Sequence, residues 1–411
     1  MKIGVIGLGY VGLPLVVAFA EAGHDVVGVD VNAGVVGALG RGESHIEDIP
    51  DERLQGILER FAPTTNYGDL SEVDAVIVAV PTPLTSNREP DLQPLIDTGT
   101  SLGNVLRKGQ LVVLESTTYP GTTRERFAPL LEESGLAAGR DFNLAFSPER
   151  IDPGRTDYTL RNTPKVVGGL TDECLRKAVE VYELVCDDVV AVSTPESAEL
   201  TKLLENIFRS VNIALVNELA MLCDRMGIDV WEVVEAAATK PYGFMSFKPG
   251  PGMGGHCLPV DPFYLAWRAR EFDMQTEFVE LAGQVNQDMP YFCVERISRA
   301  LNDQSKSVKG SRVAIVGVSY KPGVGDLRES PALRIVRLLR ERGAEVSYHD
   351  EFVPELPDLG LRSEWPEDPD CVAIVTAHPG LDVQRIVAEA PLVVDFRGVT
   401  RGIEAPHLVR L

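Results

Sequence analysis

The sequence predicts an α/β protein with two doubly wound domains joined by a central α-helical region that contains one long helix. Three observations support this fold class. Apolar strand-like runs alternate with helical stretches up to about residue 194, the same order returns from about residue 306, and a long helical period lies between them. We therefore expect domains at 1–194, 195–305 and 306–411.

The chain opens with a strand, a glycine turn, a helix and a second strand, in the segment KIGVIGLGYVGLPLVVAFAEAGHDVVGVD. Gly7 permits the tight turn, Gly9 lets the backbone approach a pyrophosphate, and Gly12 lets the helix pack closely on the strand. Asp30 closes the second strand, where a carboxylate accepts hydrogen bonds from ribose hydroxyl groups and repels a 2′-phosphate. This order predicts a Rossmann-like domain that binds NAD rather than NADP.

Three further strands are predicted in the N-terminal domain, and each ends in a polar loop. The strands begin at Asp74, Gln110 and Phe142. The loops that follow them are Pro81-Thr82-Pro83, Ser116-Thr117-Thr118 and Pro148-Glu149-Arg150. Because ligands of such parallel sheets bind beyond the carboxyl ends of the strands, we expect the three loops to line one site.

The central region begins with SAELTKLLENIFRSVNIALVNELAMLCDRMG, which keeps a helical apolar period throughout. Lys202 and Asn206 are four residues apart and project from the same face. The neighbouring Leu203, Leu204 and Ile207 indicate buried faces, so we expect the polar pair to point into a cleft. An ammonium group beside an amide there suits oxyanion stabilisation or proton transfer, and a solvated lysine is the alternative.

A loop rich in glycine and proline, from Lys248 to Gly255, precedes Cys257 and allows close backbone approach to a ligand. Beyond it, Asp261-Pro262 predicts a helix start with Asp261 as the N-cap. Two interpretations of Cys257 stand, a nucleophile near a helix N-terminus or a small apolar residue in a turn. Asp261 likewise is a cap, a carboxylate that activates water, or both. We expect the adjacent His256 to pack the loop rather than to form a Cys-His dyad.

The C-terminal domain repeats the order of strand, glycine turn, helix and strand, and its second strand ends at Asp350. The segment from Gly317 to Lys321 lacks the three-glycine spacing, so we expect a second nucleotide unit with a different ligand. Lys321 and Arg328 are its candidate phosphate-binding residues. A structural repeat with solvated charges is the alternative.

Composition and charge limit the class of protein. The 61 acidic and 39 basic residues give a net charge of -22, which argues against a nucleic-acid partner. No apolar run approaches the ~20 residues that span a bilayer, and the first residues lack a signal-peptide layout. The six cysteines form no C-x-x-C pair, so neither a zinc site nor a disulfide framework is indicated. We expect a cytoplasmic protein without membrane insertion or a metal site.

Taken together, the motifs resemble the UDP-glucose/GDP-mannose dehydrogenase family over essentially the whole chain. The matching segments are GLGYVG, VPTP, STTYPGT, SPER, ELTKLLENIFRSVNIALVNE, GPGMGGHCLPVDP and GVSYKPGVGDLRESP. The resemblance implies an NAD-dependent, four-electron oxidation of the C6 hydroxyl of a nucleotide sugar to a carboxylate.

The resemblance also implies catalytic roles. Cys257 would be the nucleophile that forms a thiohemiacetal and then a thioester, and Asp261 would help water to release the acid. Lys202 and Asn206 would stabilise the developing oxyanions. The further residues given to the relay of water or protons are Thr118 and Glu149.

Binding roles follow in the same way. Lys321 would meet the nucleotide sugar, and Arg328 a phosphate of the cofactor or substrate. The residues assigned to the cofactor are Gly7, Gly9, Tyr10, Val11, Gly12, Asp30, Pro81, Thr82, Thr118 and Arg328. The residues assigned to the substrate are Glu149, Arg150, Lys202, Asn206, Phe247, Gly250, Gly252, Gly254 and Lys321.

One departure from the family pattern narrows the substrate. Members that act on UDP-glucose or GDP-mannose tend to carry an aromatic residue after Pro-Glu and an acid three residues beyond it. Here Arg150 follows Glu149, and Asp152 lies one residue earlier than that acid. The pattern is similar to the N-acetylhexosamine branch, which implies UDP-N-acetylglucosamine, with UDP-N-acetylmannosamine and UDP-glucose as alternatives. Arg150 is our candidate for part of the acetamido pocket.

Two other functions stay open. In a single-step dehydrogenase of the hydroxyacid type, Lys202 and Asn206 would do the acid-base work and Cys257 would be structural. A nucleotide-sugar sensor without turnover is disfavoured, because such a protein is expected to lose these three residues. The long helix is apolar on several faces, which predicts a homodimer or a higher homo-oligomer.

Overall fold

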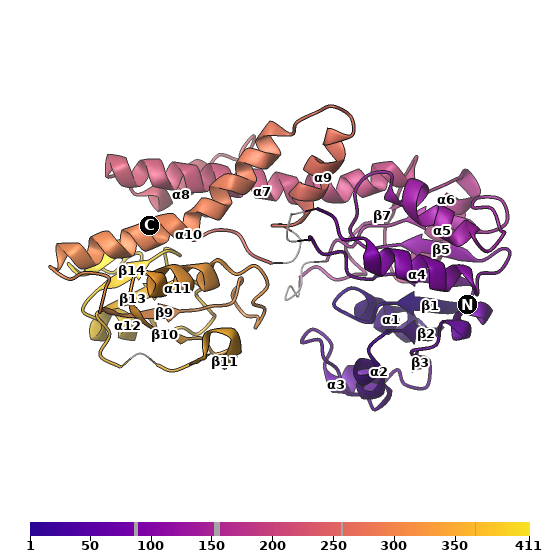
Figure 1. Ribbon diagram of the computed structural model, residues 1–411, viewed down its shortest axis with the longest axis horizontal. Helices are drawn as coiled ribbons and strands as arrows, with labels where there is room; N and C mark the ends of the chain where they lie inside the picture. The colour runs from indigo at the N-terminus through magenta and orange to yellow at the C-terminus, as the bar shows by residue number, and fades with distance from the viewer. Residues whose placement is uncertain (86–88, 152–156, 256–257, 366) are drawn as a thin grey trace. The chain divides into compact units, whose positions relative to one another are not determined.

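The chain divides into two compact units, each built around its own β-sheet. The computed structural model describes residues 1–85, 89–151, 157–255, 258–365 and 367–411. Unit 1 comprises Met1–Glu205 and Phe263–Met274, and unit 2 comprises Asn206–Pro262 and Gln275–Leu411. The colour in Figure 1 follows the chain through both units.

Unit 1 contains, within its described residues, an eight-stranded sheet of order β3-β2-β1-β4-β5-β6-β7-β8. Neighbours from β3 to β6 pair in parallel, whereas β7 runs antiparallel to β6 and parallel to β8. The sequence prediction did not include β7, and its reversal makes the sheet mixed rather than wholly parallel. No helix is found in the described part of the β6–β7 connection, and a parallel crossover usually needs one. The strands are β1 (Lys2–Ile6), β2 (Asp25–Val29), β3 (Phe61–Thr64), β4 (Ala75–Val78), β5 (Leu111–Leu114), β6 (Asn143–Phe146), β7 (Lys165–Gly169) and β8 (Val189–Val192).

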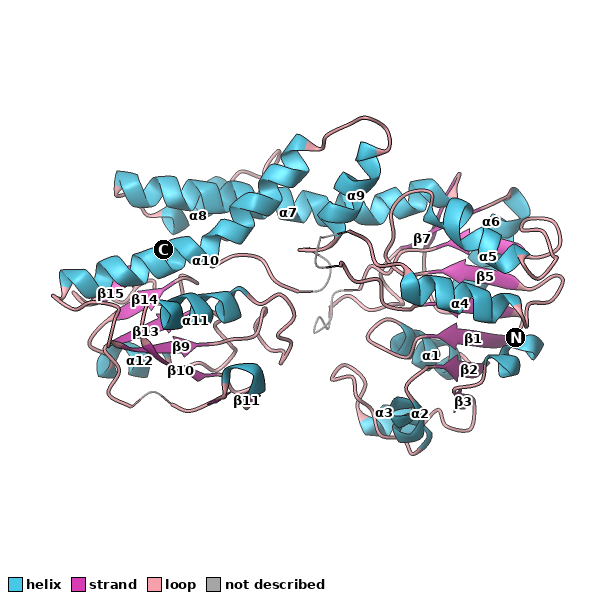
Figure 2. Ribbon diagram, in the orientation of Figure 1, coloured by secondary structure: helices cyan, strands magenta, loops and turns pink. Residues whose placement is uncertain are grey.

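Helices cover both faces of this sheet (Figure 2). Side chains of α1 and α6 share a core with Ile3, Val5 and Ile77, and side chains of α4 and α5 share another with Val76 and Val78. Successive strand residues point to opposite faces, which is why these apolar runs are buried on both sides. The helical elements are α1 (Gly12–Glu21), α2 (Ala33–Gly40), α3 (Asp51–Gln55), η1 (Tyr67–Glu72), α4 (Gln93–Gly103), η2 (Thr122–Phe127), α5 (Ala128–Glu132) and α6 (Asp172–Tyr182).

Unit 2 contains, over the described residues, a five-stranded parallel sheet of order β10-β9-β13-β14-β15. Side chains of α10 and α11 pack on one face with Val313 and Ile315, and α12 packs on the other with Ala314 and Val316. The elements are β9 (Arg312–Val316), α11 (Pro331–Glu341), β10 (Glu345–His349), β11 (Glu355–Leu356), η3 (Pro357–Leu359), β12 (Leu361–Arg362), β13 (Cys371–Ile374), α12 (Val383–Glu389), β14 (Val393–Asp395) and β15 (Leu408–Arg410).

The predicted long helix is α7, which runs for 32 residues from Pro195 to Met226. It is followed by α8 (Val230–Ala238), α9 (Asp261–Arg270) and α10 (Glu277–Asp303). Leu203 and Ile207 are buried as expected, but the side chain of Leu204 is 63% exposed, so that prediction was wrong. Leu204 instead belongs to an exposed apolar stripe of α7. The two doubly wound sheets and the long helix confirm the predicted fold class.

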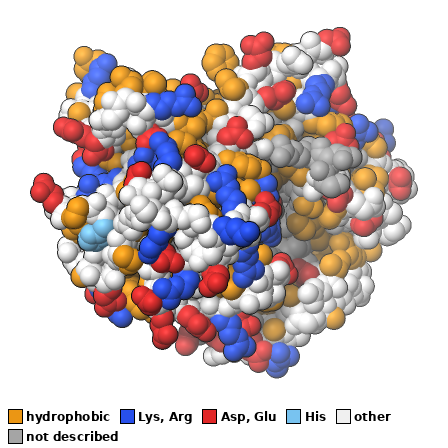
Figure 3. Space-filling model, turned by 60° about the vertical axis from the view of Figure 1, so that its left-hand side comes forward, with side chains coloured by type: hydrophobic (Ala, Val, Ile, Leu, Met, Phe, Trp, Pro, Cys, Tyr) orange, Lys and Arg blue, Asp and Glu red, His pale blue; other side chains and the backbone are white. Residues whose placement is uncertain are grey.

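No helix in the described ranges is both long enough and apolar enough to cross a membrane. On the face drawn in Figure 3, basic and acidic side chains are interspersed with apolar ones.

Glu199 in α7 binds the loop that follows β5. Its side chain is fully buried, and it accepts hydrogen bonds from the N–H of Gly121 (2.6 Å), the N–H of Thr123 (2.8 Å) and the hydroxyl of Thr123 (2.7 Å). Burial raises the pKa of Glu199 to about 7, although these three donors act in the opposite direction. The carboxylate thus caps the π-helical turn η2.

We predict that Glu199→Gln lowers the free energy of unfolding by about 1–3 kcal/mol, because the amide group presents a donor to the buried N–H groups. A carboxyl with a pKa near 7 when folded and 4.5 when unfolded binds more protons in the folded state between these values. Its contribution to stability therefore falls as pH rises from about 4.5 to about 7. Urea denaturation across this range should show the difference between wild type and variant shrinking. Glu196→Gln, at a partly exposed ion pair with Arg124, is the control and should change stability by less than about 1 kcal/mol.

Candidate active site

The glycine turn of unit 1 connects β1 to α1. A Cβ atom on Gly12 would lie 1.8 Å from the carbonyl oxygen of Gly7, so a larger residue cannot start the helix there. A Cβ atom on Gly9 would meet no atom within 4 Å, which leaves that side of the backbone open. Asp30 accepts hydrogen bonds from the N–H groups of Leu8 (2.9 Å) and Asn32 (2.9 Å). The carboxylate therefore holds the turn in shape, and its remaining acceptor sites suit ribose hydroxyl groups.

The loops after β4 and β5 contact each other. The hydroxyl of Thr82 donates to the carbonyl oxygen of Thr117 (2.6 Å), and Tyr264 donates to the carbonyl oxygen of Thr82 (2.7 Å). Thr118 is 1% exposed, and its hydroxyl has no hydrogen-bond partner within the described part of the chain. Buried hydroxyl groups are rarely left so, and a bound group would satisfy this one. The orphaned hydroxyl and the open side of Gly9 both fit a dinucleotide.

Glu149 follows β6 and is the most heavily bonded of the predicted site residues in unit 1. Its Oε1 accepts from the N–H groups of Arg150 (2.8 Å) and Ile151 (2.5 Å), and its Oε2 lies 3.5 Å from the Nζ of Lys165. Its carbonyl oxygen accepts from the Nζ of Lys202 (2.5 Å). Burial raises the pKa of Glu149, but Lys165, the two N–H groups and Lys202 outweigh it, and the net shift is downward. Glu149 is therefore held as a carboxylate.

Arg150 contacts protein groups on two sides. Its Nη2 lies 2.8 Å from the carboxylate of Glu205 in α7, and its Nη1 donates to the carbonyl oxygen of Pro164 (2.5 Å). The guanidinium group thus holds the loop after β6 to α7 and to the start of β7. Its predicted contact with an acetamido group stays a prediction.

In unit 2, Asn206 and Asp261 are bonded to each other. Both are buried, and the amide Nδ2 of Asn206 donates to the Oδ2 of Asp261, while Arg209 donates to the Oδ1 of Asn206. Helix α9 begins at Asp261 itself, one residue earlier than the N-cap prediction, a difference within the usual uncertainty of helix ends. Cys257 and His256 lie outside the described residues.

Two buried asparagines hold the loop rich in glycine and proline. The Oδ1 of Asn217 accepts from the N–H of Gly250 (2.9 Å), and its Nδ2 donates to the Oδ1 of Asn286 (3.0 Å). Asn286 in turn donates to the carbonyl oxygen of Ser210 (3.1 Å). Sequence reasoning missed both asparagines. Their signal was an amide in the middle of a helix that otherwise has an apolar period, a position where asparagine has low propensity.

The same loop packs against the glycine turn of unit 2. A Cβ atom on Gly254 would lie 2.7 Å from the Cβ of Tyr320, and one on Gly252 would lie 3.1 Å from the carbonyl oxygen of Asn286. The predicted substrate residue Phe247 packs edge-on against Phe208, with ring centroids 5.8 Å apart. Close packing therefore accounts for glycine at positions 252 and 254, as does the predicted approach of a ligand.

The glycine turn after β9 is bound by an aspartate, as the turn after β1 is bound by Asp30 in unit 1. Asp350 accepts from the N–H groups of Val318 (2.7 Å) and Ser319 (3.1 Å) and lies 3.0 Å from the Nε2 of His378. The Nδ1 of His378 accepts from the N–H of Gly323 (3.0 Å). A buried aspartate and a histidine thus shape the loop that carries Lys321.

The predicted phosphate-binding residues of unit 2 differ in their surroundings. Lys321 is half-buried, whereas Arg328 is exposed and its guanidinium group binds the carboxylate of Asp326 (2.6 Å). Sequence reasoning missed Arg397, whose Nη1 lies 2.8 Å from the position of a Cβ on Gly250. Burial lowers the pKa of Arg397. No local pattern marks this arginine, because its neighbour Gly250 is distant in sequence.

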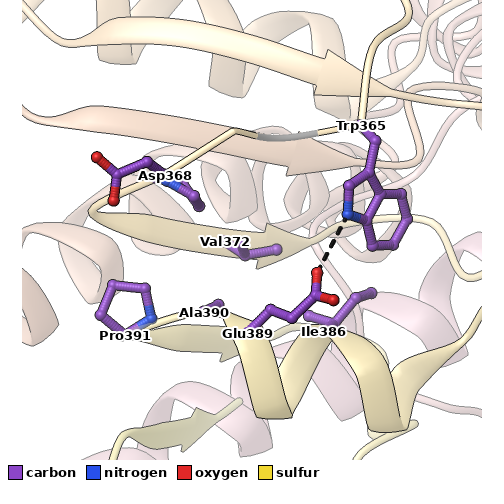
Figure 4. Close-up of a pocket in the computed structure, with 8 residues that line it drawn as sticks. Trp365, Asp368, Val372, Ile386, Glu389, Ala390 and Pro391 are labelled. Atoms are coloured by element: carbon purple, nitrogen blue, oxygen red, sulfur yellow. Dashed lines mark hydrogen bonds between the residues drawn. The ribbon is translucent and has the colours of Figure 1, made fainter.

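A small cavity of about 120 Å³ lies beside α12 and β13 in unit 2 (Figure 4). The indole N–H of Trp365 donates to Glu389 across it (3.5 Å). Ligand pockets typically enclose about 300–1,000 Å³, so this cavity does not fit a nucleotide sugar. None of the predicted site residues lines it.

Models of three domains match the chain in order. They are the NAD binding domain (residues 1–186), the central domain (residues 196–288) and the UDP binding domain (residues 314–402) of the UDP-glucose/GDP-mannose dehydrogenase family. The chain belongs to this family. The predictions of an NAD-dependent nucleotide-sugar dehydrogenase and of NAD as its cofactor are thereby confirmed.

Individual relatives agree with the family match. The chain is 39% identical to a UDP-N-acetyl-D-glucosamine 6-dehydrogenase of Pseudomonas aeruginosa, over 86% of this chain and 83% of the relative. It is 35% identical to a UDP-N-acetyl-D-mannosamine dehydrogenase of Pyrococcus horikoshii, over 98% of this chain and the whole relative. A solved structure of a UDP-D-ManNAc dehydrogenase from Pyrococcus horikoshii superposes with a TM-score of 0.92, at 33% identity, over 100% of this chain and 99% of that chain.

We predict that Thr118→Val weakens NAD binding without lowering the stability of this family member. The substitution removes a buried hydroxyl that has no partner in the described protein, so thermal unfolding should stay the same or shift upward. The Kd for NAD, measured by calorimetry, should rise by about threefold to tenfold through loss of one hydrogen bond. Thr122→Val is the control, because its hydroxyl donates to Tyr119 (2.7 Å) and its loss should lower stability instead.

Proposed function

We propose that this dehydrogenase oxidises the C6 hydroxyl of a UDP-N-acetylhexosamine to the carboxylate in a four-electron reaction. One observation carries the proposal. Lys202 and Asn206 lie one turn apart on α7, and each is bonded within its own unit to another predicted catalytic residue, Glu149 and Asp261 respectively. Family membership supports the reaction class, and the contacts support the roles of these side chains.

The turn at Gly7, Gly9 and Gly12, together with Asp30 and Thr118, would hold NAD in unit 1. Bound NAD supplies the hydride acceptor for each of the two oxidations at C6. The chain itself supplies the groups that hold the sugar, move protons and retain the intermediate aldehyde.

Cys257 is the proposed nucleophile. Its sulfur adds to the C6 aldehyde to give a thiohemiacetal, and oxidation of that adduct gives a thioester. Water then cleaves the thioester to release the acid and the free thiol, with Asp261 as the carboxylate that takes the water proton. The covalent adduct retains the aldehyde while the cofactor exchanges.

Lys202 and Asn206 are the proposed stabilisers of the oxygen at C6. The ammonium group of Lys202 has three donors, of which one binds the carbonyl oxygen of Glu149, and this contact restricts the direction of the side chain. The amide of Asn206 is restricted by Asp261 and Arg209. Donors fixed in advance stabilise developing negative charge without reorganisation during the reaction.

The substrate class rests on the pattern after Glu149 and on the relatives. The relative from Pseudomonas aeruginosa supports UDP-N-acetylglucosamine. The relative that aligns over its whole length, and the similar solved structure, favour UDP-N-acetylmannosamine as the second candidate. Arg150 remains the proposed neighbour of the acetamido group.

The reaction is tested by counting NADH released per sugar consumed. We expect two NADH with wild type, and formation of the aldehyde with loss of the second oxidation in Cys257→Ser, because a hydroxyl is a poorer nucleophile than a thiolate. A single NADH per sugar with wild type would instead support the one-step dehydrogenase of the hydroxyacid type.

The substrate is tested with UDP-GlcNAc, UDP-ManNAc, UDP-Glc and GDP-Man under the same conditions. The proposal expects the highest kcat/KM with one of the two N-acetylated sugars. A higher kcat/KM with UDP-Glc would refute the proposed substrate class and leave the family assignment intact.

We also propose a homodimer that covers the exposed apolar stripe of α7 with a second copy. In unit 2 this stripe comprises Phe208, Leu215, Leu219, Leu222 and Met226, whose exposed fractions lie between 42% and 60%. Their spacing of three, four and seven residues is that of a helix-packing seam. A partner helix would remove this surface from water.

Leu219→Glu is expected to convert the dimer to a monomer, because it places a charge in the middle of the seam. Size-exclusion chromatography with light scattering measures the mass against the 44.7 kDa of one chain. Ile96→Glu, at a 40% exposed position on α4, is the control and should keep the wild-type mass. A wild-type mass of one chain would contradict the proposal.

The three-part division at residues 194 and 305 is kept as a proposal about folding domains. The compact units divide α7 after Glu205 instead, since a helix of this length extends through both. The cytoplasmic location stays a prediction.

A further inference from the structure

A buried cluster of charged groups lies at the carboxyl edge of the sheet in unit 1, and the sequence motifs pointed to Glu149 but not to its charged partners. Its centre is Lys165, the first residue of β7, whose side chain is 3% exposed. The Nζ of Lys165 lies 3.0 Å from the Oε2 of Glu115 and 3.5 Å from the Oε2 of Glu149. Tyr182 of α6 donates its hydroxyl to the Oε1 of Glu115.

The reversal of β7 brings this lysine to the site. Phe146 pairs with Gly168 and Ala145 with Gly169 in the antiparallel register. The same register, continued beyond the strand, places Glu149 opposite Lys165. In a parallel strand, the first residue would lie at the opposite edge of the sheet, away from the loops that carry ligands.

The three oxygen atoms of Glu149 then each have a defined partner. Oε1 receives two backbone N–H groups, Oε2 faces the ammonium group of Lys165, and the carbonyl oxygen receives Lys202. Lys165 is itself held by Glu115 and by the ring of Tyr182, whose centroid lies 5.1 Å from the Nζ. The chain of contacts therefore runs from Tyr182 and Glu115 through Lys165 and Glu149 to Lys202.

We propose that Lys165 is a positioning residue: its buried ammonium group fixes the Glu149 carboxylate and, through it, the carbonyl oxygen that directs Lys202. The inference rests on the proposed function, in which Glu149 and Lys202 act on the sugar. Lys165 acts through Glu149 and is not itself a catalytic group.

The other charged groups around Glu149 do not replace this ammonium group. Glu115 has the same sign as Glu149, and burial raises its pKa. Arg150 is paired with Glu205, and Lys202 contacts the carbonyl oxygen rather than the carboxylate. Burial raises the pKa of the nearby Cys186 to about 11, so that thiol adds no charge near neutral pH.

Lys165→Met keeps an unbranched side chain, shorter by one atom, and removes its charge. Glu149 would then protonate at a higher pH, because an opposite charge at this range lowers the pKa of a carboxyl by about 1–3 units. We expect the acidic limb of the pH profile of kcat/KM to move upward by about one pH unit or more. Lys165→Arg should bring the limb back toward its wild-type position.

Two variants distinguish the proposed positioning role of Lys165 from a role in stability alone. Arg296→Met, which breaks the partly buried pair with Asp224 in unit 2, should destabilise the chain without moving the limb. In Lys165→Met alone, the buried carboxylate of Glu115 loses its partner. The double variant Lys165→Met with Glu115→Gln removes that unpaired charge as well, so it should fold better than the single variant. Its limb should be displaced relative to that of Glu115→Gln alone, and a limb at the wild-type position in the single variant Lys165→Met would overturn the proposal.

Infrared spectroscopy of the full chain tests the same contact without any sugar. In the Glu115→Gln background, Lys165→Met should raise the pH at which one carboxyl group protonates, and further substitution of Glu149→Gln should remove that signal. An unchanged midpoint would overturn the inference. Because this readout needs no turnover, it distinguishes failure of the inference from failure of the proposed function.

Discussion

A carboxylate that is removed from water must be surrounded by donors, and this constraint organises the carboxyl edge of unit 1. Glu149 meets it with two backbone N–H groups and Lys165, and Glu199 meets it with two N–H groups and a hydroxyl. The backbone donors belong to the loops that follow β5 and β6. The loops are therefore shaped by carboxylates in the interior as much as by their own turn residues.

In both units, an aspartate holds the glycine turn after the first strand of the nucleotide-type fold. In each, an aspartate directly after the second strand of the domain accepts backbone N–H groups from the glycine turn, Asp30 in unit 1 and Asp350 in unit 2. Asp30 is half-buried and keeps acceptor sites for a ribose, whereas Asp350 is buried and also contacts His378. One architecture thus presents two different surfaces to a nucleotide, which agrees with separate NAD binding and UDP binding domains.

The loop before Cys257 shows how a segment without regular structure can be held. Its glycines permit close packing on Tyr320, and its N–H at Gly250 is bound by Asn217, which Asn286 supports. Amides in a helix interior reduce helix propensity, but buried hydrogen bonds to a loop compensate for that loss. These bonds restrict the base of the loop, which suits the proposed role of Cys257 as a nucleophile.

The sequence by itself determined the order of strands and helices, the glycine turn with Asp30, the long helix and the family. Each of these depends on local patterns, namely the alternation of apolar residues, the spacing of glycines and the period of a helix. Only the tertiary structure decided that β7 reverses, that Lys165 lies beside Glu149, that Asn217 reaches Gly250 and that the hydroxyl of Thr118 is left without a partner in the described chain. Lys165 and Glu149 are 16 residues apart in the sequence, and Asn217 and Gly250 are 33 residues apart. Strand register and burial join such residues, and neither leaves a periodic trace in the sequence.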